Sequence, residues 1–332
     1  MTANLSRFHY ALYFLALASG FSAAVFIANN FLIHILGWQG AFVTLSGLGL
    51  MAGDESDAVT LTGLFQIVAF LAALAIPAYM TFKVRGDAFI SALSFHETRF
   101  HDYAAFVVSF AFWGVMFVGI VDAYISFLRI EGMLEGLFGS QMASDLGRAT
   151  WRGTYIHLPL LGLAALIATK KRGISFIWLA TLIVVAELLI VVARFIFSYE
   201  QAFMGDLVRF WYAALFLFAS AQTLVEEGHV RVDVLYAGLS EVKKALSNVF
   251  GAAVLGIPLC WVILSRGLWE KTSTINGALL KFETSQSGFG MYVKYLMAGF
   301  LIIFAFSMIL QFSSFIMTNL QKHIQESSKE TE

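Results

Sequence analysis

The sequence predicts an all-α integral membrane protein with about eight transmembrane helices. Only 13% of its 332 residues are charged, whereas a soluble domain normally carries about 25%. The mean hydropathy is +0.78. The chain contains 33 phenylalanines but only 3 prolines, a composition that suits long helices in lipid. Together these features place most of the chain inside a bilayer.

Eight stretches satisfy the length that a membrane helix needs. A helix crosses the hydrocarbon layer with about 20 mostly apolar residues, and backbone that faces lipid has to be hydrogen-bonded internally. The stretches are residues 9–36, 61–82, 103–127, 148–168, 174–197, 207–224, 245–265 and 291–317. The first is too long for the apolar core of a signal peptide, so we expect it to be retained. The fourth is the weakest, because Arg148, Arg152 and His157 interrupt it.

Several classes of function are disfavoured by composition and motifs. A net charge of -1 gives no basic field for nucleic acid. The single cysteine, Cys260, rules out a disulfide framework and a thiolate metal site. The sequence has no Gly-rich phosphate loop and no HExxH or GxSxG pattern. We therefore expect neither catalysis nor a bound cofactor or metal.

Lysine and arginine positions indicate the orientation in the membrane, since cytoplasmic loops are enriched in both. If the N-terminus is inside, the cytoplasmic segments hold twelve of the 21 basic residues. These are Arg7, Lys83, Arg85, Arg99, Lys170, Lys171, Arg172, Arg231, Lys243, Lys244, Lys322 and Lys329. The loop after the first span carries only acidic charges, at positions 54, 55 and 57. Both termini are therefore predicted to be cytoplasmic.

The stretch EEGHVRVDVLYAGLS, residues 226–240, is a polar cluster that follows the sixth span. Beyond it the apolar residues recur at helical spacing, which predicts a short amphipathic helix in the membrane interface. Asp233 is placed to cap this helix, and Arg231 to reach a headgroup or a carboxylate. Two interpretations stay open: a capped surface helix, or an elbow that docks another subunit. The elbow residues are Glu226, Glu227, His229, Arg231 and Asp233.

A shift of 146 residues aligns this elbow with residues 83–94, which follow the second span. Five of the twelve aligned columns are identical, including Arg85 with Arg231 and Asp87 with Asp233. We therefore expect two tandem four-helix units, residues 1–170 and 171–332, each with a short interfacial helix after its second span. Because an even number of crossings separates them, the two copies would have parallel orientation.

Ionisable residues also occur within the predicted spans. Glu187 and Arg194 lie seven residues apart, and so on nearly one face of the fifth span. Asp122 and Arg129 have the same spacing in the third span. Such residues can form an ion or proton relay, but a contact that locks helices together requires no titration. We interpret both pairs as helix locks.

Two landmarks of the second half resemble a known family. The fifth span ends in VVARFIFSYE, and the sixth leads into TLVEEGHVRVDVLYAGLS. This series resembles the small, DctQ-type membrane subunit of TRAP (tripartite ATP-independent periplasmic) transporters over about residues 172–320. Arg194-Phe195 matches the Arg-aromatic pair of that family, and residues 229–233 match its elbow. The chain departs from the family in its extra N-terminal half and in Lys83 and Gly86 of the first elbow.

The resemblance implies a role without chemistry. A small permease subunit of this kind braces the large multi-span subunit in the bacterial inner membrane and can help dock the periplasmic substrate-binding protein. The transporter would import organic anions, driven by sodium, with both sites on the large subunit. The expected partners are thus the large TRAP membrane subunit, the periplasmic binding protein and membrane lipid, with no nucleic acid and no cofactor on this chain.

Two alternatives from other classes remain open. A membrane anchor of a b-type cytochrome would need two histidines on facing spans, and His34 and His157 lie in or near spans. A self-sufficient transporter or channel is the second alternative.

Overall fold

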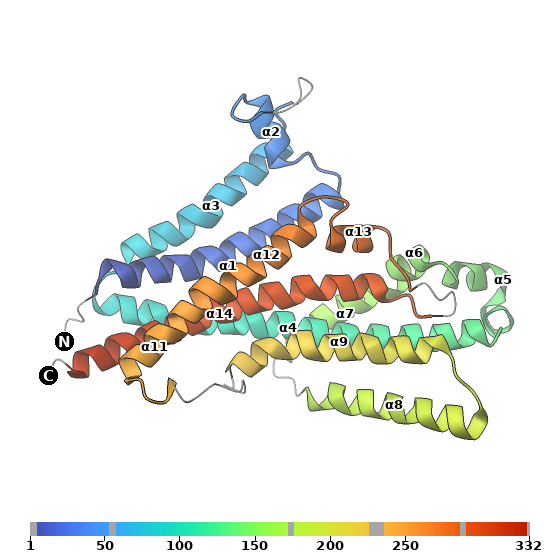
Figure 1. Ribbon diagram of the computed structural model, residues 1–332. Coiled ribbons are helices and arrows are strands. Elements are labelled where there is room, and N and C mark those ends of the chain that lie inside the picture. Colours follow the sequence, from blue (N-terminus) through green and yellow to red (C-terminus); the bar gives the residue numbers. More distant parts are fainter. Residues whose placement is uncertain (1–4, 53–57, 172–175, 226–235, 286–289, 331–332) are drawn as a thin grey trace. The chain divides into compact units, whose positions relative to one another are not determined.

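The computed structural model describes residues 5–52, 58–171, 176–225, 236–285 and 290–330, and every regular element in these ranges is helical (Figure 1). The elements are α1 (Arg7–His34), α2 (Ala41–Gly47), α3 (Leu61–Lys83), α4 (Asp87–Ile130), α5 (Leu134–Leu146), α6 (Ala149–Arg152), η1 (Gly153–His157), α7 (Leu158–Ala168), α8 (Ile177–Phe197), α9 (Ala202–Val225), α11 (Glu241–Phe250), η2 (Gly251–Gly256), α12 (Ile257–Leu268), α13 (Thr274–Leu280) and α14 (Lys294–Glu330). The predicted all-α membrane protein is confirmed.

Within the described ranges, seven helices are long and apolar enough to cross a membrane. They are α1, α3, α4, α8, α9, the continuous run from α11 to α12, and α14. The fourth predicted span is not among the seven. Its residues are helical from Ala149 to Ala168, but as the succession α6, η1 and α7. This segment buries the side chains of Arg152 and His157 completely.

The first interfacial helix, predicted over residues 83–94, is not a separate element, and this expectation was wrong. The break between α3 and α4 lies at Gly86, with φ of 60°, and α4 then runs for 44 residues without interruption. At about 1.5 Å per residue its length is about 66 Å, roughly twice the hydrocarbon thickness of a bilayer. Helix-breaking residues are missing from its first half, since no proline or glycine occurs before Gly114.

The chain divides into two compact units. Unit 1 comprises Met1–Tyr103, Glu227–Lys271 and Met308–Glu332, and unit 2 comprises Ala104–Glu226 and Thr272–Ser307. Each unit draws residues from both predicted halves, 1–170 and 171–332. The tandem duplication itself stays a prediction.

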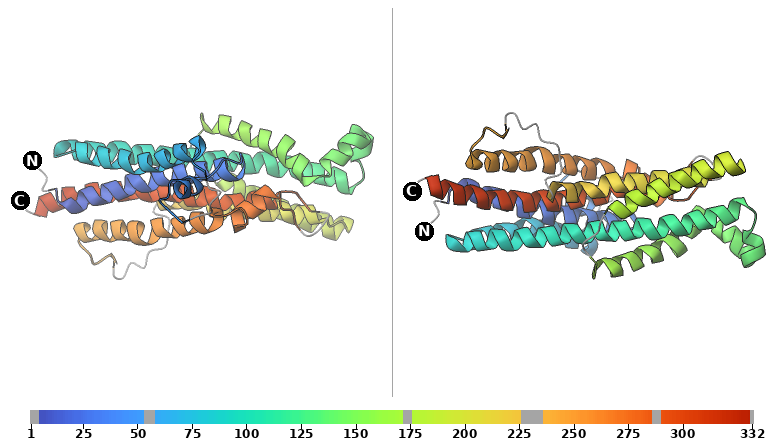
Figure 2. Two further views of the ribbon diagram at one scale, coloured as in Figure 1. Left: turned by 90° about the horizontal axis from the view of Figure 1, so that it is seen from above. Right: turned by 90° about the horizontal axis from the view of Figure 1, so that it is seen from below.

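In unit 1, α1 packs along α3 and also contacts α12. The Nδ2 atom of Asn30 donates to the carbonyl of Leu268 at 2.6 Å, which ties the end of α1 to the end of α12. At the opposite end of α1, Nε2 of His9 lies 3.4 Å from Nδ1 of His323 on α14. The beginning of α1 and the end of α14 accordingly lie side by side in both views of Figure 2.

In unit 2, aromatic residues of α9 pack against α14. The rings of Phe210 and Phe218 lie 5.1 and 4.9 Å from the ring of Phe300. The indole of Trp211 rests against α4 at Gly119, where a Cβ atom would meet the ring. A smaller apolar cluster joins the end of α4 to α5. These contacts hold the helices that carry the polar network described below.

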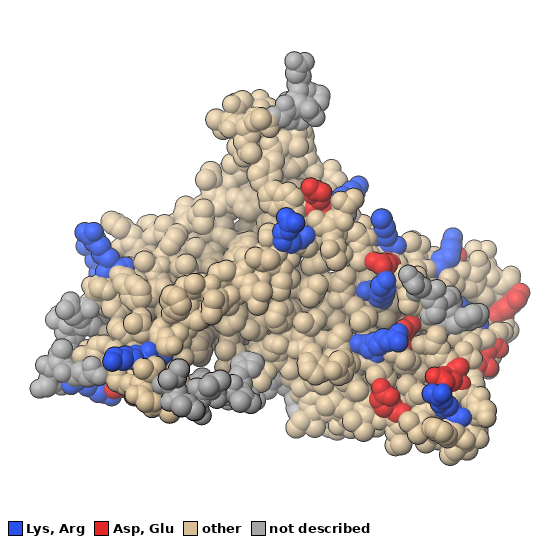
Figure 3. Space-filling view, viewed as in Figure 1, with Lys and Arg blue, Asp and Glu red and all other residues tan. Residues whose placement is uncertain are grey.

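Large apolar side chains remain exposed on several spanning helices. On α8 only Leu179 and Ala186 are buried, and on α3 Val68 and Leu71 are each 62% exposed. In the face shown in Figure 3, the surface over α1, α3 and α12 is almost free of charged side chains. Such surfaces suit lipid or another membrane protein and not water.

Candidate functional site: a buried polar network in unit 2

The principal predicted site falls outside the described residues: Glu226, Glu227, His229, Arg231 and Asp233 all lie between 226 and 235. Of the first elbow, Arg85 is exposed and its guanidinium lies 5.4 Å from the centre of the Phe82 ring. Asp87 begins α4. The proposed interfacial or docking role of these seven residues therefore stays a prediction.

The predicted lock on α8 has a different partner in the structure. The Nε atom of Arg194 lies 3.4 Å from a carboxylate oxygen of Glu200, in the turn after α8, and both side chains are more than half exposed. Glu187 is exposed on the same helix. Next to this turn, the hydroxyl of Tyr199 donates to Glu131 at 2.8 Å. Desolvation and this hydrogen bond raise the pKa of Tyr199 to about 12. A contact of Glu187 with another subunit stays a prediction.

Asp122, in α4, is the centre of a completely buried network. Its Oδ1 atom accepts hydrogen bonds from Nη1 of Arg152 at 2.8 Å and from Nε2 of His157 at 3.1 Å. Its Oδ2 atom accepts the backbone N–H of Tyr292 at 2.8 Å. The side chains of Asp122, Arg152 and His157 are all fully shielded from solvent. A buried carboxylate is costly unless it is paired and hydrogen-bonded, and both requirements are met here.

Arg152 uses its guanidinium to join three segments. Besides the ion pair with Asp122, Nη1 donates to the hydroxyl of Ser126 at 3.0 Å. Nε and Nη2 both donate to the carbonyl of Leu146, at 3.0 and 2.7 Å. That carbonyl is at the end of α5, where the last carbonyls of a helix have no intrahelical donor. One arginine therefore supplies both a counter-ion for α4 and a cap for α5.

His157 links Asp122 to α14. Because an ionised carboxylate can only accept, Nε2 of His157 is the donor toward Asp122. In the neutral ring, Nδ1 is then an acceptor, and the hydroxyl of Tyr295 lies 2.8 Å from it. The two rings stack with an angle of 12° between their planes. Both ring nitrogens of His157 are thus engaged, so haem ligation by this histidine would require one of the bonds to break.

Tyr292 carries the network toward the end of α4. Its hydroxyl donates to the carbonyl of Gly147 at 2.8 Å and accepts from Arg129. The guanidinium groups of Arg129 and Arg152 lie 4.5 and 4.3 Å from the centre of its ring. Arg129 also donates to the carbonyl of Gly290 at 2.8 Å. Asp122 and Arg129 were predicted to pair with each other. In the structure, Asp122 instead accepts the backbone N–H of Tyr292, and Arg129 donates to the hydroxyl of the same residue.

A second carboxylate holds the same segment from another helix. Oδ2 of Asp206, in α9, accepts the backbone N–H of Met291 at 3.0 Å and the hydroxyl of Ser285 at 3.1 Å. Met291 and Tyr292 are adjacent, so Asp206 and Asp122 accept consecutive backbone N–H groups just before α14. The N-terminal end of a helix has free N–H groups and a positive partial charge, which favours two carboxylates at this position.

A π-helical turn sets the positions of Arg152 and His157. The segment η1, Gly153–His157, is wound more widely than the α-helices on either side, as is common at polar or functional positions within helices. Gly153 is required there, because a Cβ atom would meet the ring of Phe282. Phe282 itself has a positive φ of 48° and packs against Tyr295 with ring centres 5.0 Å apart.

The bonds of this network connect helices within unit 2. Asp122 and Arg152 compensate each other, and the hydrogen bonds of both are directed to protein groups. In the described part of the chain, no group of three or more Asp, Glu, His or Cys side chains is placed to hold a metal ion. What the arrangement does is to fix α4, α9, the η1 segment and the start of α14 within unit 2.

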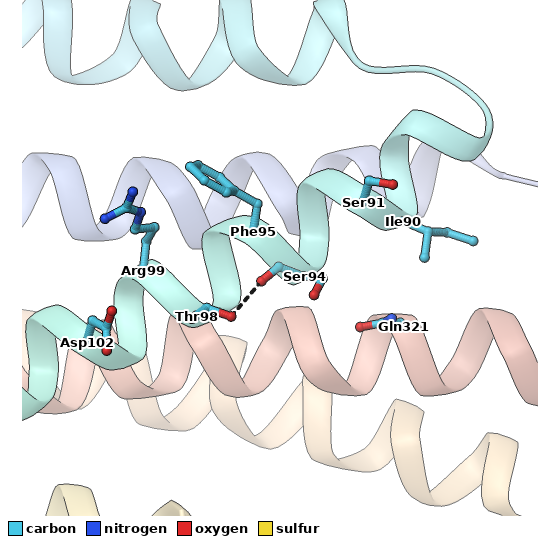
Figure 4. Close-up of a pocket in the computed structure, with 8 residues that line it drawn as sticks. All are labelled: Ile90, Ser91, Ser94, Phe95, Thr98, Arg99, Asp102 and Gln321. Carbon is cyan, nitrogen blue, oxygen red and sulfur yellow. Dashed lines mark hydrogen bonds between the residues drawn. The ribbon is translucent and has the colours of Figure 1, made fainter. Parts of the chain in front are cut away.

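Unit 1 contains a polar hollow of about 700 Å³ beside the first third of α4 (Figure 4). The hydroxyls of Ser94 and Thr98 lie along it, and Gln321 of α14 closes one side. Thr98 donates to the carbonyl of Ser94 at 3.0 Å, as the dashed line in Figure 4 marks. Arg99 leans away over the ring of Phe95, with 5.3 Å from the guanidinium to the ring centre. Asp102 also lines the hollow, so its charged side chains are of both signs.

Comparison with known families identifies the C-terminal part of the chain. Residues 175–322 match the family model described as tripartite ATP-independent periplasmic transporters, DctQ component. Residues 175–322, which are less than half of the chain, are similar to this family, and we call them the DctQ domain. The resemblance predicted from Arg194-Phe195 and the elbow is thus confirmed, and the DctQ family is a transporter-component family and not an enzyme family. Comparisons with curated proteins and with solved structures found no match.

The polar network crosses the boundary of the DctQ domain. Asp122, Arg152 and His157 precede residue 175, whereas Asp206, Tyr292 and Tyr295 lie within the matched stretch. In unit 2 the additional N-terminal residues are therefore bonded directly to the DctQ residues.

Proposed function

We propose that this chain is the small permease subunit of a TRAP transporter, which braces a larger transport subunit in the bacterial inner membrane. The observation that carries this proposal is the DctQ match over residues 175–322. In keeping with the family, the transported substrates would be organic anions that a periplasmic binding protein delivers, and sodium would bind the large subunit. This chain would add to the docking surface of the binding protein.

A bracing role fits the chemistry of the polar network. A transport site needs polar groups that can exchange their partners with a substrate or an ion, whereas Asp122 and Arg152 are buried and hydrogen-bonded to groups of the same unit. The exposed apolar faces of α3 and α8 offer surface for lipid and for the large subunit. Phe195, from the Arg-aromatic pair, is 80% exposed and available for such a contact.

The terminal helices support eight crossings with both termini on one side, which we propose is the cytoplasmic side. The contact between His9 and His323 brings the start of α1 next to the end of α14. Seven crossings would separate these ends by a membrane, whereas eight would not. The helical run from Ala149 to Ala168 supplies the eighth crossing. It can lie in a membrane because Arg152 forms an ion pair with Asp122 and His157 is hydrogen-bonded to the same carboxylate, both within unit 2.

The elbow provides a test that separates bracing from ion coupling. Arg231→Ala and Asp233→Ala, made in the complete complex, are expected to lower the yield of co-isolated large subunit. The remaining complex should transport with unchanged apparent affinity for sodium and for the organic acid whose uptake the gene deletion abolishes. Intact assembly with altered sodium dependence would mean that the elbow is a working site and not a brace.

A further inference from the structure

A crevice of about 600 Å³ lies between the beginning of α1 and the end of α3 in unit 1. Its lining includes Tyr10, Ala11 and Phe14 from α1, Ala78, Thr81 and Phe82 from α3, and Arg85 from the following turn. Ala11 and Ala78 are exposed, and their small side chains leave the space between the larger aromatic ones. The walls are thus apolar, and a guanidinium stands at one end.

The cationic end of the crevice has no carboxylate partner among the described side chains. Arg85 and Lys83 are both exposed, and their cationic groups lie over aromatic rings, of Phe82 at 5.4 Å and of Tyr79 at 5.9 Å. The first residue of α1, Arg7, is also exposed. In contrast, Lys244, Lys329 and Arg148 elsewhere in the chain each pair with a nearby acid.

Besides Arg85, the crevice is lined by two side chains with a hydroxyl group, Tyr10 and Thr81. The hydroxyl of Thr81 donates to the carbonyl of Pro77 at 2.8 Å, so it can only accept a further hydrogen bond. Among the lining side chains, Arg85 is the one that offers N–H donors to a ligand. A ligand that satisfies this site needs an anionic group at one end and an apolar body at the other.

We propose that the crevice binds an anionic phospholipid, with the phosphate at Arg85 and Lys83 and an acyl chain between α1 and α3. A free phosphate ion shares the headgroup chemistry but would leave the apolar walls in contact with water. Lys and Arg side chains attract anionic headgroups at the membrane surface, and flanking aromatic rings are typical of that interface.

The proposed lipid lies where α1, α3 and the start of α4 come together. The ring of Tyr10, one wall of the crevice, lies 4.8 Å from the ring of Phe89 in the first turn of α4. The turn that carries Arg85 connects α3 with α4. A bound lipid therefore contacts α1, α3 and the connection to α4 together, and it would stabilise the packing of the α1–α3 pair. This inference requires only that unit 1 is embedded in a membrane, and it is independent of the proposed transporter role.

The test uses the full-length chain, purified in mild detergent and delipidated, with dioleoyl phosphatidylglycerol and dioleoyl phosphatidylcholine as probes. Phosphatidylglycerol is expected to raise the thermal unfolding midpoint more than phosphatidylcholine does. Arg85→Gln should weaken the apparent affinity for phosphatidylglycerol about fivefold, the effect of one cation near an anionic membrane surface. Lys322→Gln removes an exposed cation from α14 in the same unit and should leave the affinity unchanged.

A second variant tests the apolar part. Ala78→Trp fills the crevice from its exposed rim and should lower phosphatidylglycerol binding while Arg85 is intact, at an unchanged unfolding midpoint without lipid. Equal effects of the two lipids, or Arg85→Gln and Ala78→Trp both binding like the wild type, would refute the proposal. Stabilisation by inorganic phosphate to the same extent as by phosphatidylglycerol would also refute it, because an anion site alone would then suffice.

Discussion

Asp122 of α4 and Arg152 of α6 form an ion pair of 2.8 Å in which neither side chain is exposed to solvent. Thirty residues separate them in the sequence, and the pair also engages α14 through the backbone of Tyr292. Because the two charges are buried together, the loss of either leaves the other uncompensated in a medium that solvates it poorly. This relationship makes the network a strong determinant of stability for unit 2.

Asp122→Asn is expected to lower the free energy of unfolding by about 3–5 kcal/mol, the usual cost of breaking a buried ion pair. Thermal or denaturant unfolding of the purified chain in detergent measures the change. Asp145→Asn is the matched control, since its partner Arg148 is 61% exposed and such surface pairs contribute about 0–1 kcal/mol. Equal losses for the two variants would contradict the assigned role of Asp122.

Tyr295→Phe removes only the hydroxyl that lies 2.8 Å from His157. The buried Nδ1 atom of His157 is then left without a donor, so we expect a loss of about 1–3 kcal/mol in unfolding free energy. Tyr155→Phe, at a residue that is 62% exposed, should have almost no effect. A Tyr295→Phe variant as stable as the wild type would mean that this hydrogen bond contributes nothing.

Asp206→Ala removes the acceptor for the N–H of Met291 and for the hydroxyl of Ser285. The segment before α14 should open more often, and the amide of Met291 should exchange its hydrogen with solvent faster. Hydrogen–deuterium exchange followed by mass spectrometry of peptides from this segment measures the effect. Arg209→Gln removes only the ion pair of Asp206 Oδ1 with a side chain that is 77% exposed, and it should leave the exchange unchanged because Oδ2 still accepts the N–H of Met291. Unchanged exchange in Asp206→Ala would show that other contacts hold the segment.

Gly153→Ala places a methyl group against the ring of Phe282, which is already held at a positive φ. Because that ring also packs against the ring of Tyr295, we expect the substitution to destabilise unit 2 by about 1–3 kcal/mol through overpacking. Gly162→Ala on α7 adds its methyl group to open space and should be neutral or stabilising by up to about 1 kcal/mol. The difference between their unfolding midpoints is the test, and the reverse order of stability would contradict the packing described.

The composition of the chain was sufficient to predict the fold class, since few charges and long apolar runs leave membrane helices as the only arrangement. The boundaries of the helices were harder to predict from the sequence. The alignment of residues 83–94 with the second elbow predicted a short helix there, whereas the absence of Gly and Pro from residues 87–113 indicates one long helix that begins at Asp87. The DctQ domain was recognised from Arg194-Phe195 and the elbow residues.

The buried network could be predicted only in part. Asp122 and Arg129 stood out as ionic residues within a span, but their spacing suggested a pair with each other. Arg152 and His157 were visible as interruptions of the fourth span, where they indicated a weak helix. Their actual partners, Asp122, Tyr292 and Tyr295, lie 30 to 140 residues away in the chain, and such separations depend on tertiary packing that periodicity does not encode. No motif or spacing in the sequence marked Asp206 or Tyr295 as part of a site.

The central claim, that this chain is a bracing subunit, is tested most directly by what it binds in its own membrane. The tagged full-length chain, extracted from its host in mild detergent, should co-isolate a larger multi-span membrane protein in fixed stoichiometry, as measured by native mass spectrometry. Recovery of the lone chain as a single monodisperse species under those conditions, together with full organic-acid uptake by cells that lack it, would contradict the account.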